Sequence, residues 1–182
     1  LIHFSNVNFY NNRLNTFPNS STNNFNSGVE LEYIKDSFYD RGGKQTNEIE
    51  ARAIVREIYN HYKNNPELSI GVVALSTNQR KMISDILYQE VFNNSEFEQL
   101  LKDQSEDEEL FIKNLETVQG DERDVILISI GYGKDKNGRL YMNFGPINRE
   151  GGWRRLNVLI TRSRLKIKVF SSILGKDFDL RK

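Results

Sequence analysis

The sequence contains no cysteine, which excludes disulfide bonds and thiolate metal sites. It has no excess of charge of either sign, because lysine plus arginine and aspartate plus glutamate both number 25. No apolar run approaches the ~20 residues that a membrane span needs, so we expect no membrane partner. The lack of cysteine fits a reducing compartment, and we expect a cytoplasmic protein.

Several catalytic signatures are also missing. The stretch Gly42-Gly43-Lys44-Gln45 is not a P-loop, because the first glycine and the final Ser/Thr are absent. The two histidines, His3 and His61, lack the spacing of a metal site, and we expect no metal ligands. The first residues, Leu-Ile-His-Phe, are neither a signal peptide nor an initiator methionine, so we expect a fragment of a longer protein.

Apolar strands alternate with amphipathic helices along the 182 residues, a length that suits one α/β domain. We predict strands at 31–35, 70–75, 111–115, 124–130 and 167–171. We predict helices at 1–9, from Thr46 or Asn47 to before Pro66, at 78–91 and at 153–164. Residues 1–30 otherwise form an Asn-rich irregular start, residues 96–110 a solvated helix or loop, and residues 131–145 a hairpin or excursion.

This alternation predicts a mostly parallel sheet with helices on both faces. Ligands meet such sheets at the carboxyl ends of the strands, so the informative residues should follow each strand. Charge is distributed unevenly: residues 147–182 carry ten basic and three acidic side chains, whereas residues 96–110 carry seven acidic ones against one lysine. A local basic face can bind phosphates even when the total charge is zero.

The first candidate segment covers residues 115–124, Leu-Glu-Thr-Val-Gln-Gly-Asp-Glu-Arg-Asp, directly before an apolar run. Its glycine allows the backbone to approach a phosphate closely. An ordinary turn before a core strand explains the pattern equally well. Asp121 and Glu122 are not a Walker B pair, because they precede the apolar strand instead of following it.

The second candidate is the basic segment 153–164. On a helix, Arg155 and Arg162 are seven residues apart and share a face. Two guanidiniums near the ligand-binding edge of the sheet would suit a phosphate clamp. A basic surface helix is the plainer alternative.

A third candidate is Ser76-Thr77-Asn78-Gln79-Arg80, which follows the predicted strand 70–75. Hydroxyl and amide groups at the start of a helix bind phosphate well. The same residue types are also the usual helix caps, and taken alone this segment fits capping better.

In this order, the segments resemble the second half of a superfamily 1 helicase, in the branch that includes the nonsense-mediated-decay helicase. Residues 119–124, Gln-Gly-Asp-Glu-Arg-Asp, are similar to motif V of that family, and residues 154–164, Arg-Arg-Leu-Asn-Val-Leu-Ile-Thr-Arg-Ser-Arg, closely match motif VI. Residues 47–51 resemble an Asn-x-x-Glu-Ala helix start of that branch. Residues 142–152 resemble a bacterial subgroup of large helicases that often carry a nuclease-like domain further along.

The sequence departs from the family at two positions. Ala74-Leu75-Ser76 stands where the family often has Thr-Pro-Tyr, so a phosphate contact from that threonine must be lost or moved to Ser76 or Thr77. Val118 stands where motif V usually has phenylalanine.

The resemblance implies a RecA-like domain of the P-loop NTPase type over residues 1–182, facing a first RecA-like domain upstream in the same chain. ATP and Mg²⁺ would be bound mainly by that first domain. Arg162 would be the arginine finger. The implied nucleotide-binding residues are Glu122, Arg155, Gln119 and Gly120. The implied contacts to single-stranded DNA or RNA are Thr77, Ser76 and Thr117.

Two other functions stay open at this point. One is a non-catalytic module of a degenerate helicase that binds only nucleic acid or a partner. The other is an unrelated α/β domain with a basic helix, which leaves the joint occurrence of motifs V and VI unexplained. A P-loop upstream would favour the motor, and its absence would favour the binding module.

Overall fold

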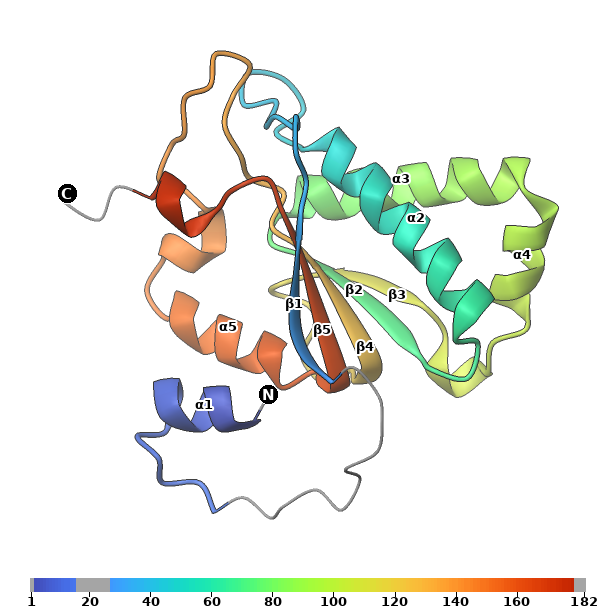
Figure 1. Ribbon diagram of the computed structural model, residues 1–182, viewed down its shortest axis with the longest axis horizontal. Coiled ribbons are helices and arrows are strands. Elements are labelled where there is room, and N and C mark those ends of the chain that lie inside the picture. Colours follow the sequence, from blue (N-terminus) through green and yellow to red (C-terminus); the bar gives the residue numbers. More distant parts are fainter. Residues whose placement is uncertain (1, 16–26, 179–182) are drawn as a thin grey trace.

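The computed structural model describes residues 2–15 and 27–178 (Figure 1). Five parallel strands form one sheet in the order β1-β5-β4-β2-β3. The strands are β1 (Gly28–Tyr33), β2 (Ile70–Ala74), β3 (Phe111–Asn114), β4 (Arg123–Ser129) and β5 (Ser163–Ser171). The helices are α1 (Ile2–Phe9), α2 (Glu48–Asn64), α3 (Thr77–Asn93), α4 (Ser95–Lys102) and α5 (Gly152–Ile160). The predicted parallel α/β sheet is confirmed.

Both faces of the sheet are covered. In Figure 1, α2, α3 and α4 lie on one side of the sheet and α5, with α1 beside it, on the other. In β4, Val125 and Leu127 pack into the core under α2 and α3, whereas Ile126 and Ile128 pack into the core that includes α5. Successive side chains of a strand point to opposite faces, so a strand buried on both faces reads as one continuous apolar run.

The direction of winding reverses within the sheet. From β1 to β2 to β3 the chain crosses by α2, α3 and α4 on one face, and from β3 to β4 to β5 it returns on the other. The carboxyl ends of the neighbouring strands β2 and β4 therefore send the chain to opposite faces. In open α/β sheets, the crevice between two strand ends at such a reversal is where ligands commonly bind.

The helix that we predicted at 153–164 ends at Ile160, so that prediction is wrong at its last turn. Residues 163–166 join β5 instead: Ser163 is in register with Arg123 of β4, and Lys166 with Gly28 of β1. Pairing with β1 and β4 provides hydrogen-bond partners for the backbone of these residues on both sides. This pairing overrides the helical pattern of the sequence. Arg162 therefore lies in the turn between α5 and β5.

The other element predictions agree with the structure more closely. The start of α2 is capped by Asn47, whose side chain accepts a hydrogen bond from the Glu50 backbone at 3.1 Å. The first strand lies at 28–33, earlier than the predicted 31–35. Residues 131–144 form an excursion without an assigned strand, and the acidic stretch contains α4 and a 3₁₀ turn at Glu106–Glu108. Much of the predicted irregular start, residues 16–26, lies outside the described residues.

No helix in the described ranges combines the length and apolar character that crossing a bilayer requires.

Gly71 of β2 gives a test of the packing between the two strands at the β3 edge. A Cβ atom at this position would lie 2.4 Å from the Phe111 ring, which must then move within a close-packed core. We expect Gly71→Ala to lower the free energy of unfolding by about 1–3 kcal/mol, measured by urea denaturation. Gly42→Ala is the matched control, because a Cβ there meets nothing within 4 Å. Equal midpoints for the two variants would contradict the packing described here.

Candidate nucleotide and nucleic-acid interface

The motif V segment crosses the sheet without a helix. Strands β3 and β4 are parallel to β2, so the chain must return from the carboxyl end of β3 to the amino end of β4 within residues 115–122. Eight extended residues reach at most about 26–29 Å, little more than the length of a seven-residue strand. Leu115 and Val118 anchor the crossing in the core. Gly120 has a φ of 96°, a backbone conformation that favours glycine.

This crossing separates in space the site residues predicted in segment 115–124. Thr117 lies near the carboxyl end of β3, Glu122 precedes β4 at its amino end, and the exposed residues Gln119 and Gly120 lie between them. The prediction that all informative residues follow strands is therefore wrong for Glu122, and it is wrong for Arg162 too, because both precede a strand. Motifs V and VI each connect to the amino end of the strand that follows them.

Arg162 and Glu122 are brought together at these amino ends. The Arg162 Nη1 atom lies 3.6 Å from Glu122 Oε1, and the Arg123 backbone donates to the Arg162 carbonyl at 3.1 Å. The guanidinium also donates from Nε to the Val158 carbonyl and from Nη2 to Thr161 Oγ1, both at 3.1 Å. The Arg162 side chain is 18% exposed and that of Glu122 53%. One edge of a well-positioned guanidinium thus faces an exposed carboxylate.

Arg155 is held elsewhere. Its Nη1 atom donates to the Pro146 carbonyl at 3.3 Å, in the 3₁₀ turn Gly145–Asn148 that precedes α5. The predicted shared helix face of Arg155 and Arg162 does not form, because α5 ends before Arg162.

A polar cluster lies at the opposite, carboxyl edge of the sheet. Asn114, the last residue of β3, donates from Nδ2 to Thr77 Oγ1 at 3.0 Å and accepts from Thr117 Oγ1 at 2.9 Å. Thr77 and Thr117 are therefore brought together, through an asparagine that the sequence reasoning missed. Its position near the end of the predicted strand 111–115, just before the candidate segment 115–124, was the available signal. Ser76 caps α3 by accepting from the Gln79 backbone at 3.1 Å.

A family described as an AAA domain matches residues 1–173. The chain belongs to this family. An uncharacterized ATP-dependent helicase, MG140, of Mycoplasma genitalium is 34% identical over 98% of the chain, and the homolog of MG140 in Mycoplasma pneumoniae is 33% identical over 98%. The chain spans 15% of the length of each relative. Together with the parallel sheet, the family match identifies the fold as a RecA-like domain of the P-loop NTPase type.

The crevice between β2 and β4 in this AAA domain is filled by a buried hydrogen-bond network. Glu50 Oε1 accepts from Ser129 Oγ at 2.6 Å and from the Gly131 backbone at 2.7 Å. The Gln79 side chain donates to Ser129 Oγ at 3.2 Å and to the Asn47 carbonyl at 3.0 Å, and it accepts from the Asn47 backbone at 2.8 Å. The network fixes the starts of α2 and α3 against the end of β4.

Glu50 is fully buried, and burial raises its pKa to about 8, although the two hydrogen bonds to Oε1 oppose the shift. Among the residues that the structure describes, none forms a hydrogen bond with its Oε2 atom. Burial penalises the charged form of a carboxyl group, so Glu50 is mostly protonated at neutral pH. In the sequence, Glu50 stands out only as part of the helix start, within the Asn-x-x-Glu-Ala pattern.

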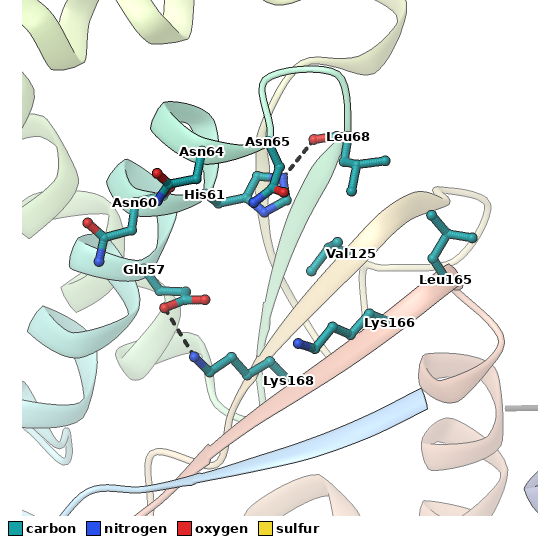
Figure 2. Close-up of a pocket in the computed structure, with 10 residues that line it drawn as sticks. All are labelled: Glu57, Asn60, His61, Asn64, Asn65, Leu68, Val125, Leu165, Lys166 and Lys168. Atoms are coloured by element: carbon teal, nitrogen blue, oxygen red, sulfur yellow. Dashed lines mark hydrogen bonds and ion pairs between the residues drawn. The ribbon is translucent and has the colours of Figure 1, made fainter. Parts of the chain in front are cut away.

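A separate pocket of about 340 Å³ lies between the last turns of α2 and strand β5 (Figure 2). Its two cations are already paired. Lys168 Nζ lies 3.1 Å from Glu57 Oε2, and Lys166 Nζ lies 2.6 Å from Glu30 Oε2 on β1. The hydrogen bond and charge of Lys166 lower the pKa of Glu30. Because carboxylates neutralise both lysines, this pocket offers little free positive charge for a phosphate.

Proposed function

We propose that this chain is the second RecA-like motor domain of an ATP-dependent superfamily 1 helicase or translocase that acts on single-stranded DNA or RNA. The observation that carries the proposal is the junction of motifs V and VI, where the Arg162 guanidinium faces Glu122 at the sheet edge. The resemblance of both motifs and the printed names of the two relatives support it.

Arg162 suits the role of an arginine finger because its guanidinium is fixed and yet available. Its bonds to Val158 and Thr161 hold the side chain, whereas the 3.6 Å contact to the exposed Glu122 is long and solvent-screened. Ion pairs of that kind contribute about 0–1 kcal/mol, so a phosphate oxygen can replace the carboxylate at little cost. The planar, permanently charged fork then offsets the negative charge of the transferring phosphoryl group.

The other nucleotide-binding residues take supporting roles in this proposal. ATP and Mg²⁺ would be held mainly by the first motor domain of the same chain, and bound ATP supplies the phosphoryl group whose transfer drives the motor. Glu122 orients Arg162 before nucleotide binds. Gln119 and Gly120, exposed on the crossing, would offer a side-chain amide and backbone groups to the nucleotide, and Arg155 braces α5 through Pro146.

The nucleic-acid strand would run along the carboxyl edge, over Ser76, Thr77 and Thr117. Thr77 and Thr117 are exposed hydroxyl residues joined by Asn114. Hydroxyl and amide donors bind phosphate and sugar without reading base sequence. Motif V connects this edge to Glu122, so one continuous segment links the strand contact with the proposed ATP contact.

The test is ATP hydrolysis by the full-length protein with and without single-stranded DNA or RNA, beside the same assay on the isolated chain. We expect strand-stimulated turnover by the full-length protein and negligible turnover by the isolated chain, because the described residues include no P-loop. Robust hydrolysis by the isolated chain would refute the shared-site account. A full-length protein that binds strands without hydrolysing ATP would make the chain a binding module.

A further inference from the structure

Two loops project together beyond the carboxyl edge of the sheet. Residues 35–46 connect β1 to α2, residues 131–145 follow β4, and the two loops lie side by side at the top of Figure 1. The Tyr39 backbone donates to the Lys134 carbonyl at 2.8 Å, which ties the loops to each other. Asn78, in the first turn of α3, donates from its side chain to the Lys44 carbonyl at 3.3 Å. The loops therefore extend the polar edge that begins at Thr77.

The loops carry an excess of positive charge, with six basic and three acidic side chains between 35–46 and 131–145. Two of the three carboxylates accept hydrogen bonds from the backbone of their own loop. Asp40 accepts from the Lys44 backbone at 3.0 Å, and Asp135 accepts from the Arg139 backbone at 2.9 Å. Five of the loop cations form no ion pair with a carboxylate in the described ranges 2–15 and 27–178. These five are Lys35, Arg41, Lys44, Lys136 and Arg139.

Aromatic rings hold most of these cations in place. The Arg41 guanidinium lies 3.8 Å from the centroid of the Tyr141 ring, and that of Arg139 lies 5.0 Å from the same centroid. Lys136 lies 5.1 Å from the ring centroid of Phe38. Cation–π contacts of this kind restrict flexible side chains without neutralising their charge. The positive charges thus remain free to meet an anionic ligand.

A cavity of about 250 Å³ opens between the loops. Its lining includes the rings of Tyr39 and Tyr132, whose centroids lie 5.4 Å apart, and the amide residues Gln45 and Asn143. Gly145 lets the Tyr132 hydroxyl approach the backbone, because a Cβ there would lie 2.3 Å from it. The cavity is smaller than the ~300–1,000 Å³ of most ligand sites, which suits a single planar group. Aromatic faces with nearby amides are what unstacked bases contact in single-strand recognition.

We propose that these two loops form a second contact for the single-stranded nucleic acid, in which Arg41, Lys44, Lys136 and Arg139 bind phosphates and the cavity receives one base. This inference rests on the proposed function and extends its strand contact beyond Thr77 and Thr117. Fixed cations beside a stacking platform are the combination that binds single strands with little sequence preference.

The test measures binding of fluorescein-labelled oligo(dT) and oligo(U) of ~20 nucleotides to the full-length protein by fluorescence anisotropy, between about 50 and 200 mM salt. We expect Arg139→Ala to raise Kd about five- to tenfold and to reduce the magnitude of the log–log salt slope by about 0.7, the value for one phosphate contact on a single strand. Tyr141→Ala should raise Kd similarly, because it releases both guanidiniums, whereas Tyr141→Phe keeps the ring and should bind like wild type.

The matched controls are Arg56→Ala on α2 and Tyr88→Ala on α3, both exposed residues outside the loops. They should leave Kd and the salt slope unchanged, and thermal melting checks that every variant folds. If Thr77→Ala weakens binding while the loop variants match wild type, the loop contact is refuted and the motor function stands. If wild type binds neither oligonucleotide and strands do not stimulate its ATPase, both proposals fail.

Discussion

Replacing Arg162 by alanine in the full-length protein should lower kcat for ATP hydrolysis by about 10³-fold or more. Arginine fingers contribute roughly 10³–10⁵ to kcat, because they meet charge that develops only as the phosphoryl group transfers. The nucleotide Kd should change far less, since the main ATP contacts belong to the first motor domain in our proposal. Steady-state kinetics with saturating single strands, together with binding of a fluorescent nucleotide, separates the two quantities.

Arg154→Ala is the control for this experiment. Arg154 lies in the same motif but is exposed on α5, with its guanidinium 5.1 Å from the Trp153 ring centroid. It should retain turnover within about twofold, as expected for a surface substitution. Arg162→Lys should recover little activity. A lysine ammonium lacks the several N–H donors of the guanidinium, which can bond Val158 and Thr161 and still bind a phosphate. Equal kcat for wild type and Arg162→Ala would leave Arg162 as a structural arginine that joins α5 to β4.

The parts of the fold that follow from local patterns could be predicted from the sequence. The run 125–128 is continuously apolar because β4 is buried on both faces, and this apolar run predicts the strand with little help from the rest of the sequence. Asn47 and Ser76 each cap the helix that follows through a bond three residues ahead. Such short-range contacts leave a signature in the sequence itself.

The parts that could not be predicted depend on distant pairing. Arg162 leaves the helix because Ser163 and Lys166 pair with two neighbouring strands, a competition that residues 153–164 alone do not reveal. The opposite placement of Thr117 and Glu122 depends on β3 and β4 lying on either side of β2. The proposed roles of these side chains come from resemblance, and the kinetic experiments above test them.

The crevice network shows the same dependence on distant contacts, since Glu50 bonds to Ser129 and Gly131 about eighty residues away.

The burial of Glu50 leads to the second large effect that we predict. Between about pH 5 and pH 8, Glu50 should lower the free energy of unfolding of the isolated chain by about 1.4 kcal/mol for each unit of rising pH. Urea denaturation at a series of pH values measures this slope.

The sign follows from where Glu50 holds its proton. Its pKa is about 8 in the folded chain, against an ordinary value of 4.5, so between these values the folded state binds more protons than the unfolded state. The contribution of Glu50 to the free energy of unfolding is therefore complete below about pH 4.5. It is lost as the pH rises toward 8, where the buried carboxyl group must ionise.

Glu50→Gln should remove this pH dependence. Glutamine keeps an acceptor for Ser129 and Gly131 and stays neutral, so the variant should gain stability relative to wild type as the pH rises. Glu48→Gln, an exposed substitution in the same first turn of α2, is the control and should follow the wild-type curve. Parallel curves for wild type and Glu50→Gln would show that Glu50 is ionised in the folded chain. A neutral Glu50 adds no negative charge beneath the carboxyl edge of the sheet, where our proposal places a polyanionic strand over Ser76 and Thr77.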